Sequence, residues 1–122
     1  MNEMLEKLGQ NAKDAETVLR NLSTNDKNKT LEAAAAALVE HTEEILKANA
    51  LDVENGRKNQ MSEGLIDRLM LTPERIEGMA DGLRQLTGLE DPIGEVTGMK
   101  KRPNGLMIGQ KRVPLGVIGI IY

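Results

Sequence analysis

The chain has 122 residues, of which 39% are hydrophobic and 29% charged, as in a soluble globular protein with one modest core. Its formal net charge of −3 argues against a nucleic-acid or anionic-membrane partner, because neither surface attracts an acidic protein. It contains no cysteine, so disulfides and thiolate chemistry are excluded, and its only aromatic residue is one tyrosine, so the core must be aliphatic.

Two long helices are predicted in the first half of the chain. In residues 2–22 apolar side chains recur every three or four positions and form one stripe, which ends at the turn-forming residues 23–26. A second helix is predicted over residues 26–55, with an alanine run in its middle and Gly56 just after its C-terminus. We expect these two helices to pair antiparallel.

Two shorter helices are predicted next. Ser62 caps the first, and Thr72-Pro73-Glu74 begins the second with a capping hydroxyl, a proline and an acid. Gly78 and Gly82 lie one turn apart, which favours close packing of this helix against another backbone. Gly88 ends the helix, and its apolar residues are expected to be buried: Ile76, Met79, Ala80, Leu83 and Leu86.

The spacing of apolar residues becomes that of strands after Pro92. Segments 95–102 and 106–113 flank Pro103-Asn104-Gly105, and Asn-Gly between two such arms predicts a β-hairpin. After Pro114 an uncharged, β-branched run is typical of a strand buried on both faces of a parallel sheet. Because such a strand needs neighbours reached through crossovers, we expect this chain to be a piece of a longer α/β protein.

Few residues carry candidate chemistry, and none is assigned to catalysis or to a metal. His41 is the only histidine; without a nucleophile or second ligand near it, we interpret it as an ordinary helix residue. The cluster Lys100–Arg102, with Lys111 and Arg112 across the turn, could bind phosphate, but we favour charges that protect an exposed strand edge. Gly116–Gly119 lacks the pattern of a phosphate loop.

Several short sequence motifs after the first helix occur together in one known family. They are Ile45–Asn49 with Asp52, Leu65–Leu69, Arg75-Ile76, Gly82–Gln85, Asp91–Gly94, Arg102–Leu106 and Val113–Tyr122. With them the chain resembles gamma-glutamyl phosphate reductases (glutamate-5-semialdehyde dehydrogenases), of the aldehyde dehydrogenase superfamily. The resemblance covers essentially the whole chain after the first helix.

The resemblance implies an α/β parent fold with a Rossmann-like cofactor domain, of which this chain would be a mainly helical N-terminal fragment. Residues 1–94 would be the helical part of the cofactor-binding domain, and residues 95–114 a bridging or oligomerisation hairpin. Residues 115–122 would be the first, cut-short strand of the Rossmann-like sheet. Since ligands bind beyond the carboxyl ends of such strands, Ile121 and Tyr122 are the implied cofactor-binding residues.

The implied function is that of an NADPH-dependent enzyme of proline biosynthesis, which reduces gamma-glutamyl phosphate to glutamate 5-semialdehyde. The family's reaction runs through a cysteine thioester, and that cysteine lies downstream, so this chain alone would be inactive. A cytoplasmic homo-oligomer, with glutamate 5-kinase as a possible pathway partner, is implied, whereas no nucleic acid or membrane is expected. The alternative is a standalone helical module for self-association, without catalysis.

Overall fold

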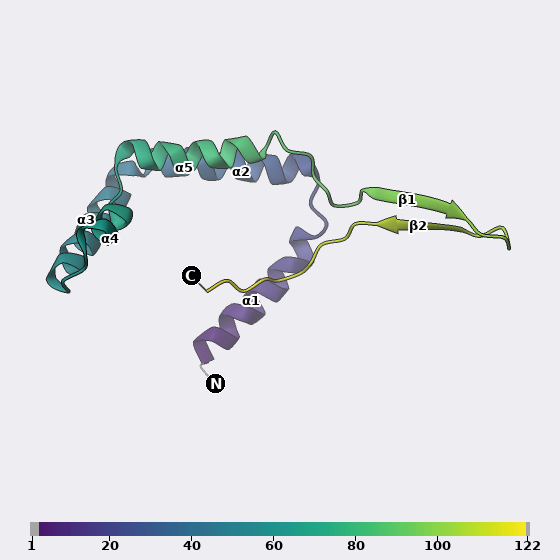
Figure 1. Ribbon diagram of the computed structural model, residues 1–122, viewed down its shortest axis with the longest axis horizontal. Coiled ribbons are helices and arrows are strands. Elements are labelled where there is room, and N and C mark those ends of the chain that lie inside the picture. Colours follow the sequence, from purple (N-terminus) through teal and green to yellow (C-terminus); the bar gives the residue numbers. More distant parts are fainter. Residues whose placement is uncertain (1–2, 122) are drawn as a thin grey trace. The chain divides into compact units, whose positions relative to one another are not determined.

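The computed structural model describes residues 3–121. Figure 1 shows the order of helices and strands within these residues. They divide into two compact units: Asn25–Leu89 form one, and the described residues up to Thr24, together with those from Glu90 onward, form the other. The elements are α1 (Glu3–Leu19), α2 (Thr24–Glu40), α3 (Thr42–Lys58), α4 (Glu63–Leu69), α5 (Pro73–Leu86), β1 (Val96–Lys101) and β2 (Met107–Lys111).

The single helix predicted over residues 26–55 is wrong, because the helix breaks at His41 into α2 and α3. The Thr42 hydroxyl donates to the carbonyls of Leu38 (3.3 Å) and Val39 (2.8 Å), and so takes the place of backbone donors at the end of α2. Such bonds from a hydroxyl back to the preceding turn compete with the regular helical ladder and bend helices. The antiparallel pairing expected for the first two helices stays a prediction, since α1 lies in the other unit.

α3 also continues past Gly56, which was expected to follow its end. Gly56 is buried, and a Cβ atom there would lie 2.9 Å from Cδ1 of Ile66 in α4. The glycine therefore allows α4 to approach α3 closely. The left-handed residue that follows α3 is instead Gln60, with φ of 57°.

The core of the Asn25–Leu89 unit is small and aliphatic. α3 packs against α4 and α5. The start of α2 meets the end of α5, because the Asn28 amide of α2 donates to the carbonyl of Thr87 just after α5 (3.2 Å), and from there the two helices run in opposite directions (Figure 1). The buried aliphatic side chains are Ala35, Val53, Ile66, Ile76 and Ala80.

Two polar side chains hold the connection between α4 and α5. Asn49, buried on α3, donates to the carbonyl of Leu69 (2.9 Å) and accepts from the amide of Leu71 (2.8 Å). Arg75, in the first turn of α5, donates to the carbonyls of Asp67 and Met70 and pairs with the Asp67 carboxylate. The connection thus takes its shape from side chains of α3 and α5, which bond carbonyls at the end of α4 and the Leu71 amide.

α5 begins as predicted: Thr72 is its N-cap, Pro73 its first residue, and the Thr72 hydroxyl accepts from the amide of Arg75 (3.2 Å). The burial expected along this helix is confirmed for Ile76 and Ala80 and wrong for two others, since Met79 and Leu86 are exposed. The close packing expected at Gly78 and Gly82 is also wrong within the described residues, because a Cβ at either position would face open space.

The cap of α5 gives a first testable prediction. Thr72→Ala is expected to lower the free energy of unfolding by about 1 kcal/mol in a urea titration. Ser62→Ala is the matched control, because Ser62 is the N-cap of α4 but makes no capping hydrogen bond. An equal loss in both variants would contradict a role for the Thr72 hydroxyl.

The same cap makes the stability of α5 dependent on pH. A bond from its own backbone amide and a second from the Thr72 hydroxyl hold the pKa of Glu74 below its ordinary value of 4.5. A carboxylate whose pKa falls on folding stabilises the folded chain above its unfolded pKa, and this contribution is lost as the pH falls through the folded pKa. The Thr72→Ala loss should therefore be larger near neutral pH than near pH 3.

The predicted hairpin is confirmed at its tip. Arg102–Gly105 form a turn in which the amide of Gly105 donates to the carbonyl of Arg102 (2.9 Å). Pro103 supplies the fixed φ of the first corner position, and Gly105 has a left-handed φ of 89°. The amide of Arg102 then donates to the carbonyl of Leu106 (2.8 Å), which closes a three-residue hairpin loop.

β1 and β2 pair antiparallel, from Lys101 opposite Met107 to Val96 opposite Lys111. A β-bulge between Val96 and Gly98 interrupts the register. All residues of both strands are exposed, so within the described residues nothing covers either face of the ribbon. This hairpin lacks the packing that a third strand or a helix would give. An isolated two-stranded ribbon of this kind is at best marginally stable in water.

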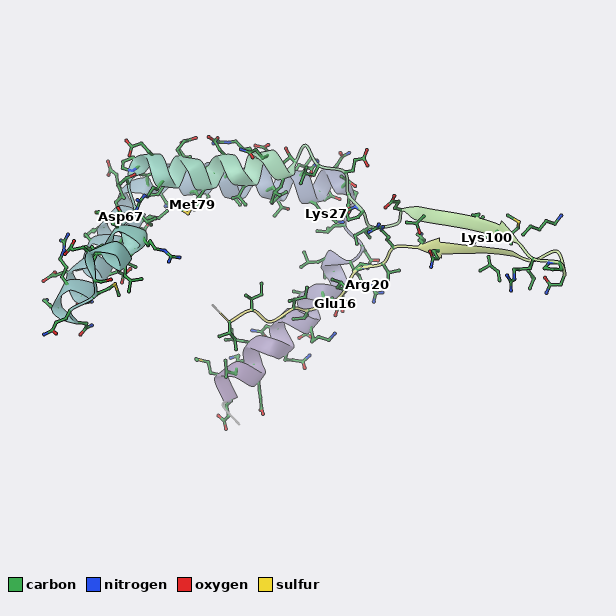
Figure 2. The ribbon with its side chains drawn as sticks, viewed as in Figure 1. Glu16, Arg20, Lys27, Asp67, Met79 and Lys100 are labelled. Atoms are coloured by element: carbon green, nitrogen blue, oxygen red, sulfur yellow. The ribbon has the colours of Figure 1, made fainter. Side chains whose placement is uncertain are left out.

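The strand predicted at the end of the chain is not formed: residues 113–121 lie outside any strand, and Tyr122 lies outside the described residues. An extended segment becomes a strand only through hydrogen bonds to a neighbour, and none of the described segments pairs with it. Its role as the first strand of a Rossmann-like sheet stays a prediction. The segment passes α1 instead, where a Cβ at Gly116 would lie 3.6 Å from the Glu16 carboxylate (Figure 2).

α1 keeps its predicted apolar stripe but buries none of its residues. The Lys13 ammonium bonds the Glu16 carboxylate (2.7 Å), and this hydrogen bond and charge lower the pKa of Glu16. Because α1 and the terminal segment bury so little, their apolar side chains lie in water, and this exposure is costly for so many large residues. The exposed ones include Met4, Leu5, Leu8, Val18, Leu19, Leu115, Ile118, Ile120 and Ile121.

Candidate functional site

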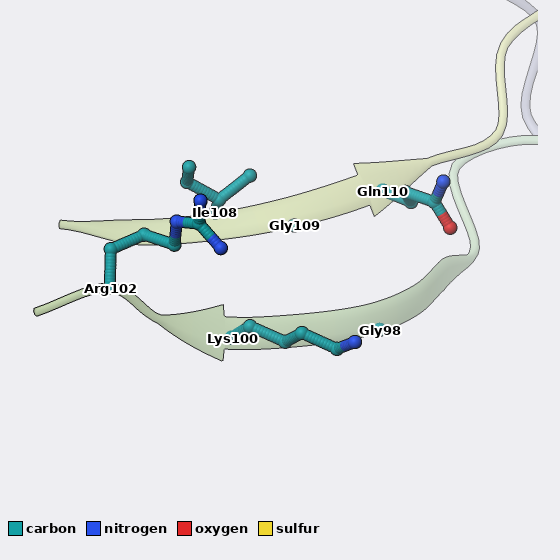
Figure 3. A pocket seen from close by; sticks show the side chains of 6 residues that line it. All are labelled: Gly98, Lys100, Arg102, Ile108, Gly109 and Gln110. Carbon is teal, nitrogen blue, oxygen red and sulfur yellow. The ribbon is translucent and has the colours of Figure 1, made fainter.

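The basic cluster of the hairpin, which we interpret as charges that protect a strand edge, is divided by the structure between two faces. Lys100 and Arg102 line a shallow hollow on one face, together with Ile108 and Gln110 (Figure 3). Lys101 and Lys111 occupy alternate positions of the ladder, and alternate residues of a strand point to opposite faces. Because side chains alternate between the two faces along each strand, the division of the basic residues could have been predicted from the residues on either side of the turn. The sequence-based prediction missed it.

The hollow is partly open to solvent. Gly98 and Gly109 form part of its floor, and an added Cβ at Gly109 would meet Sδ of Met99 at 2.7 Å. Its two cations are long, exposed side chains, and the described lining contains no nucleophile and no carboxylate. Catalysis needs groups that are held in fixed positions, and these exposed side chains are not. Such a surface suits contact with another protein segment instead.

Arg112 does not join the cluster. Its guanidinium bonds the Glu95 carboxylate (2.9 Å), and its backbone amide bonds the Glu95 carbonyl (2.9 Å). The Gly94 amide in turn donates to the carbonyl of Arg112 (3.0 Å). Arg112 thus closes the open end of the hairpin.

The predicted cofactor residues, Ile121 and Tyr122, stay a prediction. Ile121 is fully exposed at the end of the described terminal segment, and Tyr122 lies outside the described residues. Residues 113–121 supply only aliphatic, proline and glycine side chains, so this segment offers no side-chain donor for a phosphate and no partner for a ribose. This segment therefore offers a dinucleotide only its backbone groups and aliphatic contacts.

The other candidate chemistry is equally modest. Nδ1 of His41 lies 3.2 Å from the Glu44 carboxylate, and both side chains are exposed at the start of α3. No group of three or more histidine, aspartate or glutamate residues within the described chain could hold a metal ion. None of the described helices is long and apolar enough to span a membrane.

These features define the class: a helical segment with an exposed hairpin, whose apolar surfaces call for cover by further protein. Comparison with known proteins identifies the family that it resembles. The chain is 59% identical over 98% of its length to gamma-glutamyl phosphate reductase of Lachnospira eligens, and 62% identical over 93% to that of Heliobacterium modesticaldum. No family profile matches it.

Solved structures agree with these relatives. The crystal structure of gamma-glutamyl phosphate reductase from Thermotoga maritima matches 93% of the chain with a TM-score of 0.86 and 42% identity. The enzyme from Saccharomyces cerevisiae matches 88% of the chain with a TM-score of 0.80 and 27% identity. The predicted resemblance to this family is therefore confirmed, as is the mainly helical fold with one hairpin.

The chain corresponds to only part of these enzymes. It covers 29% of the Lachnospira relative, 27% of the Heliobacterium relative and 27% of the Thermotoga chain. The rest of their length has no counterpart among these 122 residues.

Proposed function

We propose that this chain is the N-terminal part of a reductase that converts gamma-glutamyl phosphate to glutamate 5-semialdehyde with NADPH, in proline biosynthesis. The observation that carries the proposal is the 59% identity to a gamma-glutamyl phosphate reductase over 120 residues. With no cysteine, the chain lacks the thiolate that this chemistry requires and contributes structure rather than catalysis.

Three regions have separate roles in this proposal. Residues 1–94 form the helical part of the cofactor-binding domain, residues 95–114 a bridging or oligomerisation hairpin, and residues 115–122 the first strand of a Rossmann-like sheet. The exposed hairpin and the apolar, unpaired residues 115–121 support these roles, because both need a neighbour to bury them.

The remaining parts of the proposal concern the whole enzyme. Ile121 and Tyr122 lie beside the dinucleotide once the sheet is complete, and NADPH binds there as the hydride donor. The enzyme is a cytoplasmic homo-oligomer that receives its acyl phosphate from glutamate 5-kinase. The acidic net charge of −3 supports a soluble location.

A chimera tests the proposal. Residues 1–122 replace the matching segment of the Lachnospira eligens relative, and the purified chimera is assayed for phosphate-dependent reduction of NADP⁺ by glutamate 5-semialdehyde. We expect activity close to that of the parent, because a segment of 59% identity preserves the packing faces. A folded, oligomeric but inactive chimera would contradict the proposal.

The isolated chain gives the complementary prediction. Titration of NADPH into the 122-residue chain, followed by calorimetry, should give no saturable binding, because a dinucleotide needs a crevice between several strand ends. The chimera is the positive control. Micromolar affinity of the isolated chain would show that its site is already complete.

A second candidate is a standalone module for self-association, favoured by the uncovered hairpin and the exposed stripe of α1. Sedimentation of the isolated chain over a concentration series distinguishes it. A defined dimer that Ile108→Lys disrupts would favour this module, whereas a monomer or irregular aggregates would favour the reductase segment.

A further inference from the structure

The hairpin tip contains a pair of residues with chemistry of its own. The sequence has two Asn-Gly pairs, Asn55-Gly56 and Asn104-Gly105. In such a pair the backbone nitrogen of glycine can attack the side-chain amide carbon of asparagine, because glycine has no Cβ to obstruct the approach. Whether this happens depends on how firmly the fold holds the two groups apart.

At Asn104 the geometry favours attack. Asn104 and Gly105 are both exposed, and the amide nitrogen of Gly105 is held only by its turn bond to the Arg102 carbonyl (2.9 Å). The Leu106 amide donates to Oδ1 of Asn104 (3.2 Å). This donor draws electrons from the side-chain carbonyl and would stabilise negative charge on that oxygen during attack, as an oxyanion donor does.

The surrounding charge acts in the same direction. Lys100 and Lys101 precede the turn and Arg102 begins it, and no acidic residue lies between Lys100 and Arg112 in the sequence. Attack requires the glycine amide to lose its proton, and nearby positive charge favours the anion so formed. The same cations favour the carboxylate of the product.

Asn55 is the internal comparison. It lies inside α3, and Gly56 is buried against Ile66. The Met61 amide donates to the Gly56 carbonyl (3.0 Å), and the Asn59 amide to the Asn55 carbonyl (3.0 Å). Attack at this pair requires opening of the end of α3 and its contact with α4, whereas attack at Asn104 requires opening of one exposed turn.

We propose that Asn104 is a site of spontaneous deamidation and isomerisation, and that the fold protects Asn55. The Gly105 nitrogen bonds to Cγ of Asn104, the Cγ–Nδ2 bond breaks, and ammonia leaves with the proton of the glycine amide. One solvent water then opens the resulting succinimide to aspartate or isoaspartate. No oxidant or cofactor takes part, and the tip gains one negative charge.

The product changes the hairpin. Isoaspartate places one extra backbone carbon inside a three-residue loop, where register is fixed by loop length. Aspartate keeps the backbone but adds a carboxylate beside Lys101 and Arg102, which alters the charge of the surface in Figure 3.

Peptide mapping of the aged native chain tests the proposal. After incubation at mildly alkaline pH, trypsin releases residues 102–111 with Asn104 and residues 48–57 with Asn55, because cleavage fails before Pro103. Mass spectrometry measures the conversion of each peptide, and chromatography separates the aspartate and isoaspartate forms. Asn104 should convert at least about tenfold faster than Asn55, a ratio equivalent to about 1.4 kcal/mol.

Two controls link the ratio to the fold. In concentrated denaturant the two rates should become similar, because both pairs are then equally free. Asn104→Gln should abolish conversion of its own peptide and leave Asn55 unchanged. A native ratio near one, or faster conversion at Asn55, would overturn the proposal, and so would an unconverted Asn104 under conditions where the denatured chain reacts.

Discussion

Ile66→Ala is expected to lower the free energy of unfolding by about 2–5 kcal/mol, because it removes a fully buried side chain and leaves a cavity. Ile66 is 1% exposed and lies over Gly56, where its Cδ1 fills the space next to the α3 backbone. Because the Asn25–Leu89 unit has few other buried side chains, few neighbours can move in to fill the cavity. Urea titration followed by the helical circular dichroism signal measures the loss.

Leu65→Ala is the matched control, since Leu65 is the preceding residue on the same short helix and is 50% exposed. Its loss should be clearly smaller, because about half of its side chain is in water in the folded chain. Similar losses in both variants would mean that α4 contributes through its helix propensity and not through the contact of Ile66 with α3.

Asn49→Ala is expected to cost about 2–3 kcal/mol, since it leaves the Leu69 carbonyl and the Leu71 amide without their partner. The Leu69 carbonyl ends α4 and the Leu71 amide lies just after it, and no helical bond replaces Asn49 at either group. Hydrogen exchange of the Leu71 amide should quicken strongly, whereas the Arg75 amide, capped by Thr72, should change only with global stability.

Asn55→Ala on the same helix is the control for Asn49→Ala, because Asn55 is exposed and its side chain makes no hydrogen bond within the described structure. It should be neutral or slightly stabilising, since alanine has the higher helix propensity. Unchanged exchange at Leu71 in Asn49→Ala would rule out the proposed role of the amide.

Local chemistry made parts of the fold predictable. Thr72-Pro73-Glu74 and Pro103-Asn104-Gly105 specify a helix start and a turn through the φ angle of proline, a hydroxyl acceptor and a left-handed glycine. The break at His41 was not predictable in the same way. The apolar spacing continues through it, and the bonds of the Thr42 hydroxyl that accompany it are visible only in the structure.

The candidate site was less predictable than the fold. Ile121 and Tyr122 came from the resemblance alone, because the terminal run carries no motif for a dinucleotide. The importance of Asn49 depends on carbonyl and amide groups some twenty residues away, so its sequence neighbours could not reveal it. A polar residue among the apolar positions of α3 was the one available signal.

The hairpin also has a consequence for the order in which the chain folds. Its ladder joins residues near in sequence, from Lys101 and Met107 at the tip to Val96 and Lys111 at the base. Contacts of such low contact order form fast, in about 1–10 μs for a hairpin, without waiting for distant segments to meet. Since neither strand is buried, the ribbon can form and open many times while the helices assemble, so its population reports on its own turn and ladder.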